Sequence, residues 1–307
     1  MKNLDFKSLY SFIESNPTEQ SCRKYFETIR WKDGIQCPHC QNKEKKIYRF
    51  ASNSLYKCSA CKKQFSLTKG TIFEKSHIPL RKWFALILLF SDKKSCSANY
   101  ISRELNIAYS NAYFALHRIR KCMTNIIRPK LTGVVEIDET FVGGKNKNRH
   151  YKDRKPHSQG RCTKYKKPII GMLSRETGEV RLLALSNLKK EGLQLLVRNK
   201  IEAGSTISTD EYRGYKGLNK FFTHGQCNHG AYQYVNDIYH TNSLEGFWGH
   251  VKRNINGIYH KVSRIKLVFY CREFEFRYNN RNLSLSEKFH KLLGQTFNIR
   301  LMRKDLD

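Results

Sequence analysis

The chain has 307 residues, of which 57 are Lys or Arg and 26 are Asp or Glu, giving a formal net charge of +31. This length allows two or three domains with a sizeable core. So large a positive charge, spread along the whole chain, indicates a polyanionic partner such as nucleic acid. No apolar run is long enough to span a bilayer, and residues 1–10 lack the apolar segment of a signal peptide. We therefore expect a soluble, intracellular protein with no membrane partner.

The chain begins with a predicted helical lead-in over residues 1–30. Apolar side chains cluster on it before Pro17, which interrupts the pattern. A second helix is expected over residues 19–29, shortly before the first cysteine pair.

Four of the ten cysteines form two CxxC pairs separated by seventeen residues: Cys37, Cys40, Cys58 and Cys61. This is the spacing of a zinc ribbon, in which four thiolates hold one structural Zn²⁺ ion. His39 lies inside the first pair and is expected to be a bystander. Short strands are expected at residues 47–50, 55–57 and 64–67. The other cysteines are expected to be free thiols in a reducing compartment.

Three helices are expected after the ribbon. The apolar residues 80–90 predict a buried helix. A brief turn then separates a helix over residues 98–105 from one over residues 111–123, with Ser97 and Ser110 placed as their N-caps.

Helix, short turn and helix in a basic chain fit two interpretations. One is a helix-turn-helix with residues 111–121 as the recognition helix, and the other is an ordinary helical hairpin. The sequence favours neither. In the first interpretation four side chains are available to DNA: Asn111, His117, Arg118 and Lys121.

Residues 143–168 form a strongly basic segment, in which ten of 26 residues are Lys or Arg and Asp153 is the one acid. Glycines begin this segment and prolines punctuate it, which predicts a flexible arm or hairpin. A solvated loop is the alternative, but the net charge of the chain favours contact with DNA phosphates. The candidate contacts are Lys145, Lys147 and Arg149.

An α/β domain is predicted in the second half of the chain. Its elements are strands at residues 134–142, 168–174, 180–186 and 206–209, with a helix over residues 191–203 before the last strand. The order strand, strand, strand, helix, strand is that of a ribonuclease-H-like domain. Residues 224–237 can hold a fifth strand.

Two aspartates lie where the predicted strands would bring them together. Asp138 lies in an apolar strand, where a charge is costly to bury unless it is paired or bound to a metal. Alternation directs Asp138 and Glu139 to opposite faces. Asp210 ends the fourth strand, which lies beside the first in such a sheet. Two carboxylates this close repel each other and need a divalent cation between them, which indicates a magnesium site.

Residues 240–260 predict an amphipathic helix with an apolar stripe. Glu245 and Lys252 are seven residues apart and therefore lie on one face, at the border of that stripe. A carboxylate there can reach toward Asp138 and Asp210 across the sheet edge. The alternative is a surface acid on an amphipathic helix.

Taken together, these segments resemble the DDE transposases of bacterial insertion sequences, in the zinc-ribbon group related to the eukaryotic Merlin elements. The match covers roughly residues 20–281 in the order of the family. The matching segments are CPHC…CSAC continuing into FSLTKGTIFEKSHIPLRKWF, VEIDETFVGG, STDEYRGYKGL, HTNSLEGFWGHVKRNINGIYHKVS and EFEFRYNNR.

The resemblance implies an acidic triad of Asp138, Asp210 and Glu245 that binds catalytic Mg²⁺ or Mn²⁺ ions. It also implies a catalytic role for Lys252, which matches a basic residue that such families carry seven positions after the acid. In part of the group an Asn takes the third acidic role, so Asn242 is the alternative third ligand. Further DNA contacts are expected from Lys252, Arg253, His260, Arg277 and Arg281.

The resemblance further implies the activity and the partners. The activity is metal-dependent cleavage at the terminal inverted repeats of an insertion sequence, followed by strand transfer into target DNA. A homodimer or larger assembly on paired ends is expected, in the bacterial cytoplasm and associated with the nucleoid when bound to DNA. The expected domains are a helical lead-in (1–30), a zinc ribbon (31–75), a helix-turn-helix-like DNA-binding region (76–130), a ribonuclease-H-like catalytic domain (131–290) and a C-terminal tail (291–307).

Two other classes of function stay open from the sequence. A zinc-ribbon regulator without catalysis accounts for the charge and for residues 37–123, but not for carboxylates placed on strands. A ribonuclease-H-like nuclease that cuts without joining shares every acidic residue, so only the family resemblance separates it from a transposase.

Overall fold

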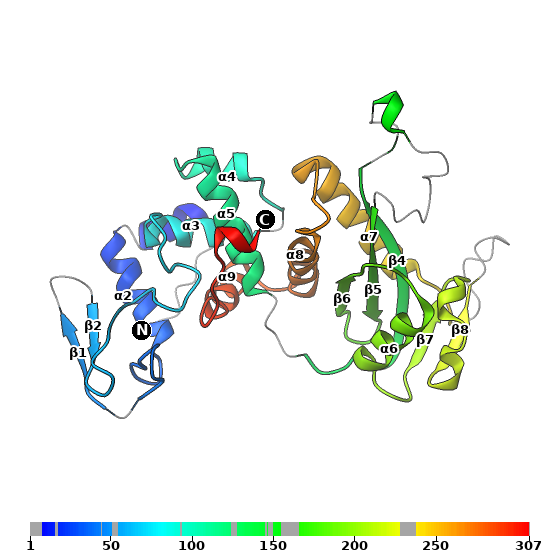
Figure 1. The fold of residues 1–307 in the computed structure, drawn as a ribbon, viewed down its shortest axis with the longest axis horizontal. Coiled ribbons are helices and arrows are strands. Elements are labelled where there is room, and N and C mark those ends of the chain that lie inside the picture. Colours follow the sequence, from blue (N-terminus) through cyan, green and yellow to red (C-terminus); the bar gives the residue numbers. More distant parts are fainter. Residues whose placement is uncertain are drawn as a thin grey trace. The chain divides into compact units, whose positions relative to one another are not determined.

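The chain divides into two compact units, each described here by itself (Figure 1). The ribbon unit comprises Met1–Asn125 and Asn282–Asp307, and the sheet unit comprises Ile126–Arg281. The chain thus finishes in the unit where it began. The computed structural model describes residues 8–15, 18–43, 45–50, 55–92, 94–123, 128–144, 146, 150–154, 166–227 and 238–306.

The described part of the ribbon unit contains a small sheet and several helices. Its elements are α1 (Leu9–Ser15), α2 (Glu19–Arg30), β1 (Ile47–Phe50), β2 (Leu55–Cys58), β3 (Gln64–Ser66), α3 (Leu80–Ser91), α4 (Ala98–Glu104), α5 (Tyr109–Cys122) and α9 (Leu285–Gly294), with a 3-10 turn at Arg303–Asp305.

The three short strands predicted for the ribbon are present and form an antiparallel sheet in the order β1-β2-β3. On one face of this sheet the rings of Tyr56 and Phe65 stack, with centroids 5.5 Å apart. Trp31, which follows α2, meets Tyr56 edge-on at 4.7 Å. Aromatic packing on this face therefore attaches the ribbon to the helices.

Two predicted helix caps had different outcomes. Ser97 caps α4 as predicted, since its hydroxyl accepts a hydrogen bond from the Tyr100 N–H at 3.1 Å. The predicted Ser110 cap is wrong. Helix α5 begins one residue before Ser110, at Tyr109, and its N-cap residue Ala108 makes no side-chain cap.

The C-terminal helix α9 completes the core of the ribbon unit. The ring of Phe289 lies 6.0 Å from that of Phe12 in α1 and 5.6 Å from that of Phe84 in α3. All three side chains are almost fully buried. The chain therefore leaves the sheet unit at residue 281 rather than at the expected 290, because the apolar face of α9 packs on α1 and α3.

The sheet unit holds a five-stranded mixed sheet. Its described elements are β4 (Val134–Gly143), β5 (Lys166–Ser174), β6 (Val180–Ala184), α6 (Lys190–Lys200), β7 (Thr206–Thr209), β8 (Thr223–Gln226), α7 (Asn242–Asn254) and α8 (Leu267–Asn279). Short turns lie at Tyr151–Asp153, Arg213–Tyr215 and Leu218–Lys220, and a π-helical turn at Ile255–Tyr259 extends α7.

The strand order is β6-β5-β4-β7-β8. Strands β4, β5 and β6 are antiparallel neighbours, whereas β4, β7 and β8 run parallel. The predicted elements up to β7 are present in the predicted order. A fifth strand was predicted as possible within residues 224–237, and β8 (Thr223–Gln226) lies at the start of that range. Residues 228–237 lie outside the described residues.

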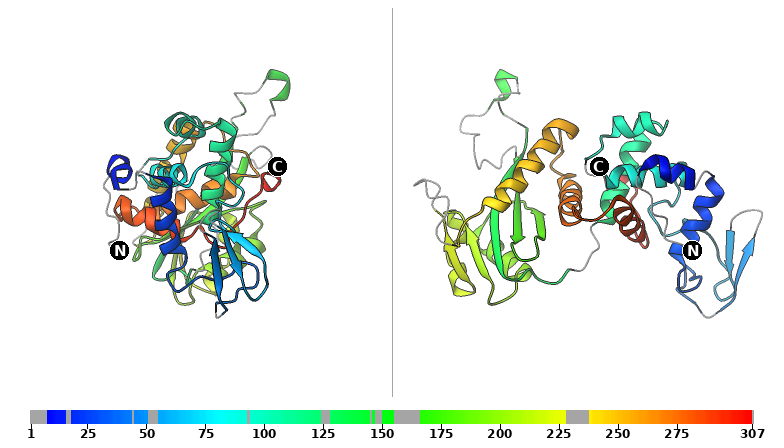
Figure 2. Two further views of the ribbon diagram at one scale, coloured as in Figure 1. Left: turned by 90° about the vertical axis from the view of Figure 1, so that its left-hand side faces the viewer. Right: turned by 180° about the vertical axis from the view of Figure 1, so that it is seen from behind.

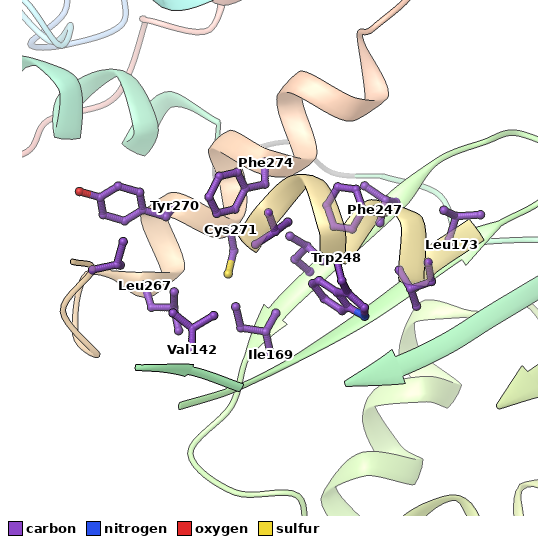
Figure 3. Close-up of a cluster of buried hydrophobic side chains, with 14 residues drawn as sticks. Val142, Ile169, Leu173, Phe247, Trp248, Leu267, Tyr270, Cys271 and Phe274 are labelled. Carbon is purple, nitrogen blue, oxygen red and sulfur yellow. The ribbon is translucent and has the colours of Figure 1, made fainter. Parts of the chain in front are cut away.

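The sheet carries a helical layer on each face (Figures 1 and 2). On one face, Phe247 and Trp248 of α7 and Phe274 of α8 pack against Leu173 and Ile169 of β5 (Figure 3). On the other face, Leu193 and Val197 of α6 pack in a second core with one residue from each of three strands: Ile137 of β4, Ile170 of β5 and Ile207 of β7. Alternation along β4 and β5 thus supplies two cores and fixes which face each side chain reaches.

Helix α8 protects the edge strand β6. Asn279 accepts a hydrogen bond from the Val180 N–H and donates one to the Val180 carbonyl, both at 2.8 Å. The fully buried Glu275 carboxylate accepts from the Leu182 N–H and from the guanidinium of Arg272 at 3.0 Å. Unpaired strand edges promote intermolecular pairing, so these side chains take the place of a further strand.

Replacing Glu275 with Ala should lower the free energy of unfolding by about 3 kcal/mol, because the buried Leu182 N–H and Arg272 would lose their acceptor. Chemical denaturation of the full chain measures this difference. Glu202→Ala, which removes an exposed acid of the same unit, is the control and should change it by less than about 0.5 kcal/mol. Equal effects of the two substitutions would contradict the assigned role of Glu275.

Candidate active site

Two aspartates lie together at the centre of the sheet. The parallel pairing of β4 with β7 runs to Ile137 opposite Thr209, so Asp138 and Asp210 come next on their strands. The predicted adjacency of these strands is confirmed. Asp138, Asp210 and Glu139 each offer a carboxylate oxygen, and these three oxygens lie within 4.8 Å of one another.

Glu139 is the member of this group that was not predicted from the sequence as a site residue. Its carboxylate accepts a hydrogen bond from the Tyr215 hydroxyl at 2.8 Å, and Tyr215 belongs to the core beside α6. Asp138 instead contacts Trp248, in the core beside α7. The two side chains therefore leave β4 on opposite faces, as alternation requires, yet their oxygens converge. The one signal in the sequence was the adjacency of Glu139 to Asp138.

The electrostatics of the site disfavour a charge on Asp138. Burial, with the neighbouring charge of Asp210 and a smaller effect of Glu245, raises the pKa of Asp138 from 3.8 to about 6. The Glu139 N–H and the Trp248 indole N–H donate to the Asp138 carboxylate at 2.8 and 3.0 Å and oppose this rise. A bound cation would offset the repulsion between these carboxylates, and their oxygen atoms are ligands that suit a hard divalent ion.

The position of α7 is fixed by a buried ion pair. Glu136 is fully buried on β4 and accepts from Arg175 at 2.7 Å and from the Leu244 N–H, in the first turn of α7, at 2.9 Å. Arg175 also donates to the carbonyls of Ile238 and His240 at 2.6 and 2.9 Å. Acceptors at a helix N-terminus stabilise it. Glu136 and Arg175 therefore attach the start of α7 to the sheet.

The predicted third ligand, Glu245, lies one residue beyond that attachment. It is exposed, and its carboxylate accepts from the Thr241 hydroxyl at 3.0 Å. Glu245 is not part of the 4.8 Å group, although its charge contributes to the raised pKa of Asp138. Lys252 and Asn242 are also exposed on α7. The choice between Glu245 and Asn242 as third ligand therefore stays a prediction.

A second group of metal-binding character lies in the ribbon. The Sγ atoms of Cys37, Cys40, Cys58 and Cys61 all lie within 4.8 Å of one another. The pairs Cys37–Cys61 and Cys40–Cys58 are each 3.7 Å apart. Backbone N–H groups, first that of Cys61, lower the pKa of the Cys58 thiol to about 7. The four sulfurs could therefore hold one metal ion.

Two of the predicted DNA contacts on α5 are wrong. His117 is 0% exposed and Arg118 is 8% exposed, with the guanidinium of Arg118 donating to the Ile72 carbonyl at 2.7 Å. The C-terminal segment also packs on α5, where Arg303 lies over Phe114 and donates to Asn111 at 3.0 Å. The choice between a helix-turn-helix and an ordinary helical hairpin stays a prediction.

The remaining predicted DNA contacts differ in accessibility. Asn111 and Lys121 are partly exposed, and Lys252, Arg253 and His260 are exposed. Arg277 is mostly buried and pairs with the buried Glu273 at 2.9 Å, which makes it a structural residue. Arg281 donates to the Gly178 carbonyl at 3.3 Å. Lys145, Lys147 and Arg149 lie outside the described residues.

Comparison with known proteins identifies the chain. An ISXO2-like transposase domain matches residues 130–279, and a transposase zinc-ribbon domain matches residues 17–64. These matches define the class as the transposases of transposable elements. Within that class, the chain belongs to the ISXO2-like family with an N-terminal zinc ribbon.

Two relatives agree with this assignment. The "uncharacterized protein in transposable element ISH50" of Halobacterium salinarum is 28% identical over 277 residues, which is 86% of this chain and 92% of the relative. An "uncharacterized transposase-like protein" of Haemophilus influenzae is 27% identical over 106 residues, covering 34% of this chain and 85% of the relative.

Among solved structures, a chain of the simian T-cell lymphotropic virus intasome in complex with PP2A regulatory subunit B56 gamma matches with a TM-score of 0.30. That match is 11% identical and covers 62% of this chain and 65% of that chain, which is too distant to support an argument. In the part of the chain that the structure describes, no helix is both long and apolar enough to cross a membrane.

Without Mg²⁺ or Mn²⁺, Asp138→Asn should stabilise the folded chain near pH 7. The pKa of Asp138 is about 6 in the folded chain against an ordinary 3.8, which corresponds to about 3 kcal/mol of destabilisation once the carboxyl is ionised. Because the folded-state pKa is the higher one, this penalty is absent below about pH 4 and complete above about pH 6. Thermal unfolding of both proteins should show a larger gain at pH 7.5 than at pH 5, and equal gains would contradict the electrostatic argument.

Proposed function

We propose that this chain binds the terminal inverted repeats of its element and catalyses DNA strand cleavage and strand transfer. The supporting observation is the convergence of Asp138, Asp210 and Glu139 within 4.8 Å, in a chain of the transposase family. The sheet order β6-β5-β4-β7-β8, with the first three strands antiparallel, supports a ribonuclease-H-like fold for the sheet unit. A dimer or larger assembly brings the two ends together.

The acidic side chains would hold the divalent ions. Asp138 and Asp210, with Glu245 from α7 as the third ligand, supply the oxygen donors that Mg²⁺ or Mn²⁺ prefers. Two such ions, if bound here, would supply stabilisation of the attacking and leaving oxygens of phosphodiester transfer. Lys252, exposed on the same helix as Glu245, binds a DNA phosphate near the reacting strand.

The reaction consists of two displacements at phosphorus. Water attacks the phosphodiester at the end of the element, and the bond to the leaving 3′ oxygen breaks, which produces a free 3′-hydroxyl. That hydroxyl then attacks a phosphodiester of the target DNA: a P–O bond to the 3′ oxygen of the element forms while the P–O bond to the 3′ oxygen of the target strand breaks. One phosphodiester bond thus replaces another without an external energy source. The nuclease alternative ends after the first displacement, and the assay for joined product separates the two.

The cysteine group fits a structural Zn²⁺ ion. A tetrahedron with Zn–S bonds of about 2.3 Å has sulfurs about 3.8 Å apart. The Cys37–Cys61 and Cys40–Cys58 sulfur pairs, at 3.7 Å each, agree with that value. Four thiolates leave no open position for substrate, so this ion stabilises the ribbon and does no chemistry.

Replacing Asp138 or Asp210 with Asn should reduce Mg²⁺-dependent cleavage of a terminal-repeat duplex on the order of a thousandfold, because the ions lose an anionic ligand. DNA affinity should stay near wild type, since loss of an acid from a basic protein does not weaken its attraction for phosphate. Gel-based cleavage, joining and binding assays measure the three quantities. Loss of DNA binding in parallel with cleavage would contradict the catalytic assignment.

The third ligand is tested by comparing Glu245→Gln, Asn242→Ala and Glu139→Gln. Glutamine keeps the size of Glu but loses the charge that a divalent ion requires. We expect Glu245→Gln to abolish cleavage and Asn242→Ala to retain it. Full activity of Glu245→Gln, together with an inactive Asn242→Ala or Glu139→Gln, would assign the third position to Asn242 or Glu139 instead.

Metal analysis of the purified full chain should find about one equivalent of zinc, lost in Cys58→Ser because a three-sulfur site binds zinc more weakly. His39→Ala is the matched control. His39 lies between Cys37 and Cys40 but contacts the Gln64 carbonyl at 3.2 Å, so this variant should keep its zinc. A folded ribbon without zinc in the wild-type chain would refute this assignment.

A further inference from the structure

Trp248 lies over the residue of β5 that pairs with Asp138. That residue is Gly171. A Cβ atom at Gly171 would lie 2.6 Å from Cζ2 and 2.9 Å from Cη2 of Trp248, distances that real side chains do not adopt. The φ angle of Gly171 is not in the left-handed region, so the glycine is required here for space and not for backbone freedom. The absence of a side chain on β5 therefore lets the indole approach the sheet.

The approach of the indole has a chemical result. Its Nε1–H donates to Oδ2 of Asp138 at 3.0 Å, while the N–H of Glu139 donates to Oδ1 at 2.8 Å. The two donors come from different elements, α7 and the β4 backbone, and each holds one oxygen. Because a carboxylate has about four lone-pair positions, both oxygens keep room for a cation. The rotation of the carboxylate is thus fixed before any ion binds.

We propose that Trp248 is a positioning residue, whose indole N–H, seated over Gly171, holds the Asp138 carboxylate in the orientation that binds the divalent ion. This inference rests on the proposed function. Trp248 follows Glu245 by three residues on α7, so attachment of this helix by Glu136 places both side chains at once. Hydrogen bonds from outside the ligand set typically contribute 10- to 100-fold to metal affinity.

The first test measures Mn²⁺ affinity by calorimetry on the full, zinc-loaded chain, with thermal stability recorded in parallel. Trp248→Phe keeps an aromatic ring in the core but removes the N–H, and should weaken Mn²⁺ binding about 10- to 100-fold. Phe247→Leu is the control, because Phe247 is equally buried on α7 and belongs to the same core. It should lose stability but keep its Mn²⁺ affinity. Saturating Mn²⁺ should restore cleavage by Trp248→Phe.

The second test is a double-mutant cycle with Gly171→Ala. Alone, the added methyl group displaces the indole and should also weaken Mn²⁺ binding. In the Trp248→Phe background the smaller ring removes the two shortest contacts, and only the end of the Leu244 side chain, at 3.0 Å from the added Cβ, must shift slightly. Gly171→Ala should therefore cause little further loss of Mn²⁺ affinity, and the two effects should be strongly non-additive.

The outcomes separate this inference from the proposed function. If Asp138→Asn binds Mn²⁺ as tightly as wild type, the proposed metal site itself is wrong. If Asp138→Asn loses Mn²⁺ while folded Trp248→Phe keeps native affinity, Trp248 has no positioning role. Should Trp248→Phe fail to fold, Gly171→Ala decides: native Mn²⁺ affinity in that variant overturns the inference.

Discussion

The buried carboxylate of Glu136 is the contact on which the arrangement of the site depends. A charge without access to water is tolerated only when it is paired and hydrogen-bonded. The buried Glu136 carboxylate accepts hydrogen bonds from the Arg175 guanidinium and from the Leu244 N–H in the first turn of α7. Its pairing therefore requires α7 to lie on this face of the sheet. Helix α7 in turn delivers the indole to Asp138 and carries the exposed Glu245 and Lys252. One buried charge thus couples folding of the core to assembly of the site.

Much of this arrangement could be predicted from local pattern. The cysteine spacing predicted the ribbon, and apolar alternation predicted the strands that carry Asp138 and Asp210. The parallel pairing of β4 with β7 followed from the order of elements, because connections between parallel strands obey few topologies. Glu139 was excluded by the same alternation that placed Asp138. Alternation decides the face from which a side chain leaves, but not where the end of a longer side chain comes to lie.

The rest depended on contacts between residues distant in the chain. His117 and Arg118 read as solvent-facing on an isolated helix, but α5 is covered by the Ile72 loop and by the C-terminal segment around Arg303. The sequence around Phe289 likewise did not predict its contacts with Phe12 and Phe84, which lie more than two hundred residues earlier in the chain. Periodicity identifies an apolar face but not the surface that covers it.

The return of the chain to its first unit has a consequence for biosynthesis. Because α9 supplies the ring that closes the core around α1 and α3, the ribbon unit cannot complete that core while the ribosome is still synthesising the sheet unit. The inserted sheet unit, which is continuous in the chain from Ile126 to Arg281, can form first. A nascent chain that stops before α9 would therefore have a complete carboxylate cluster in the sheet unit while the core of the ribbon unit is still incomplete. Synthesis of α9 (Leu285–Gly294) therefore comes before the ribbon unit can complete its core.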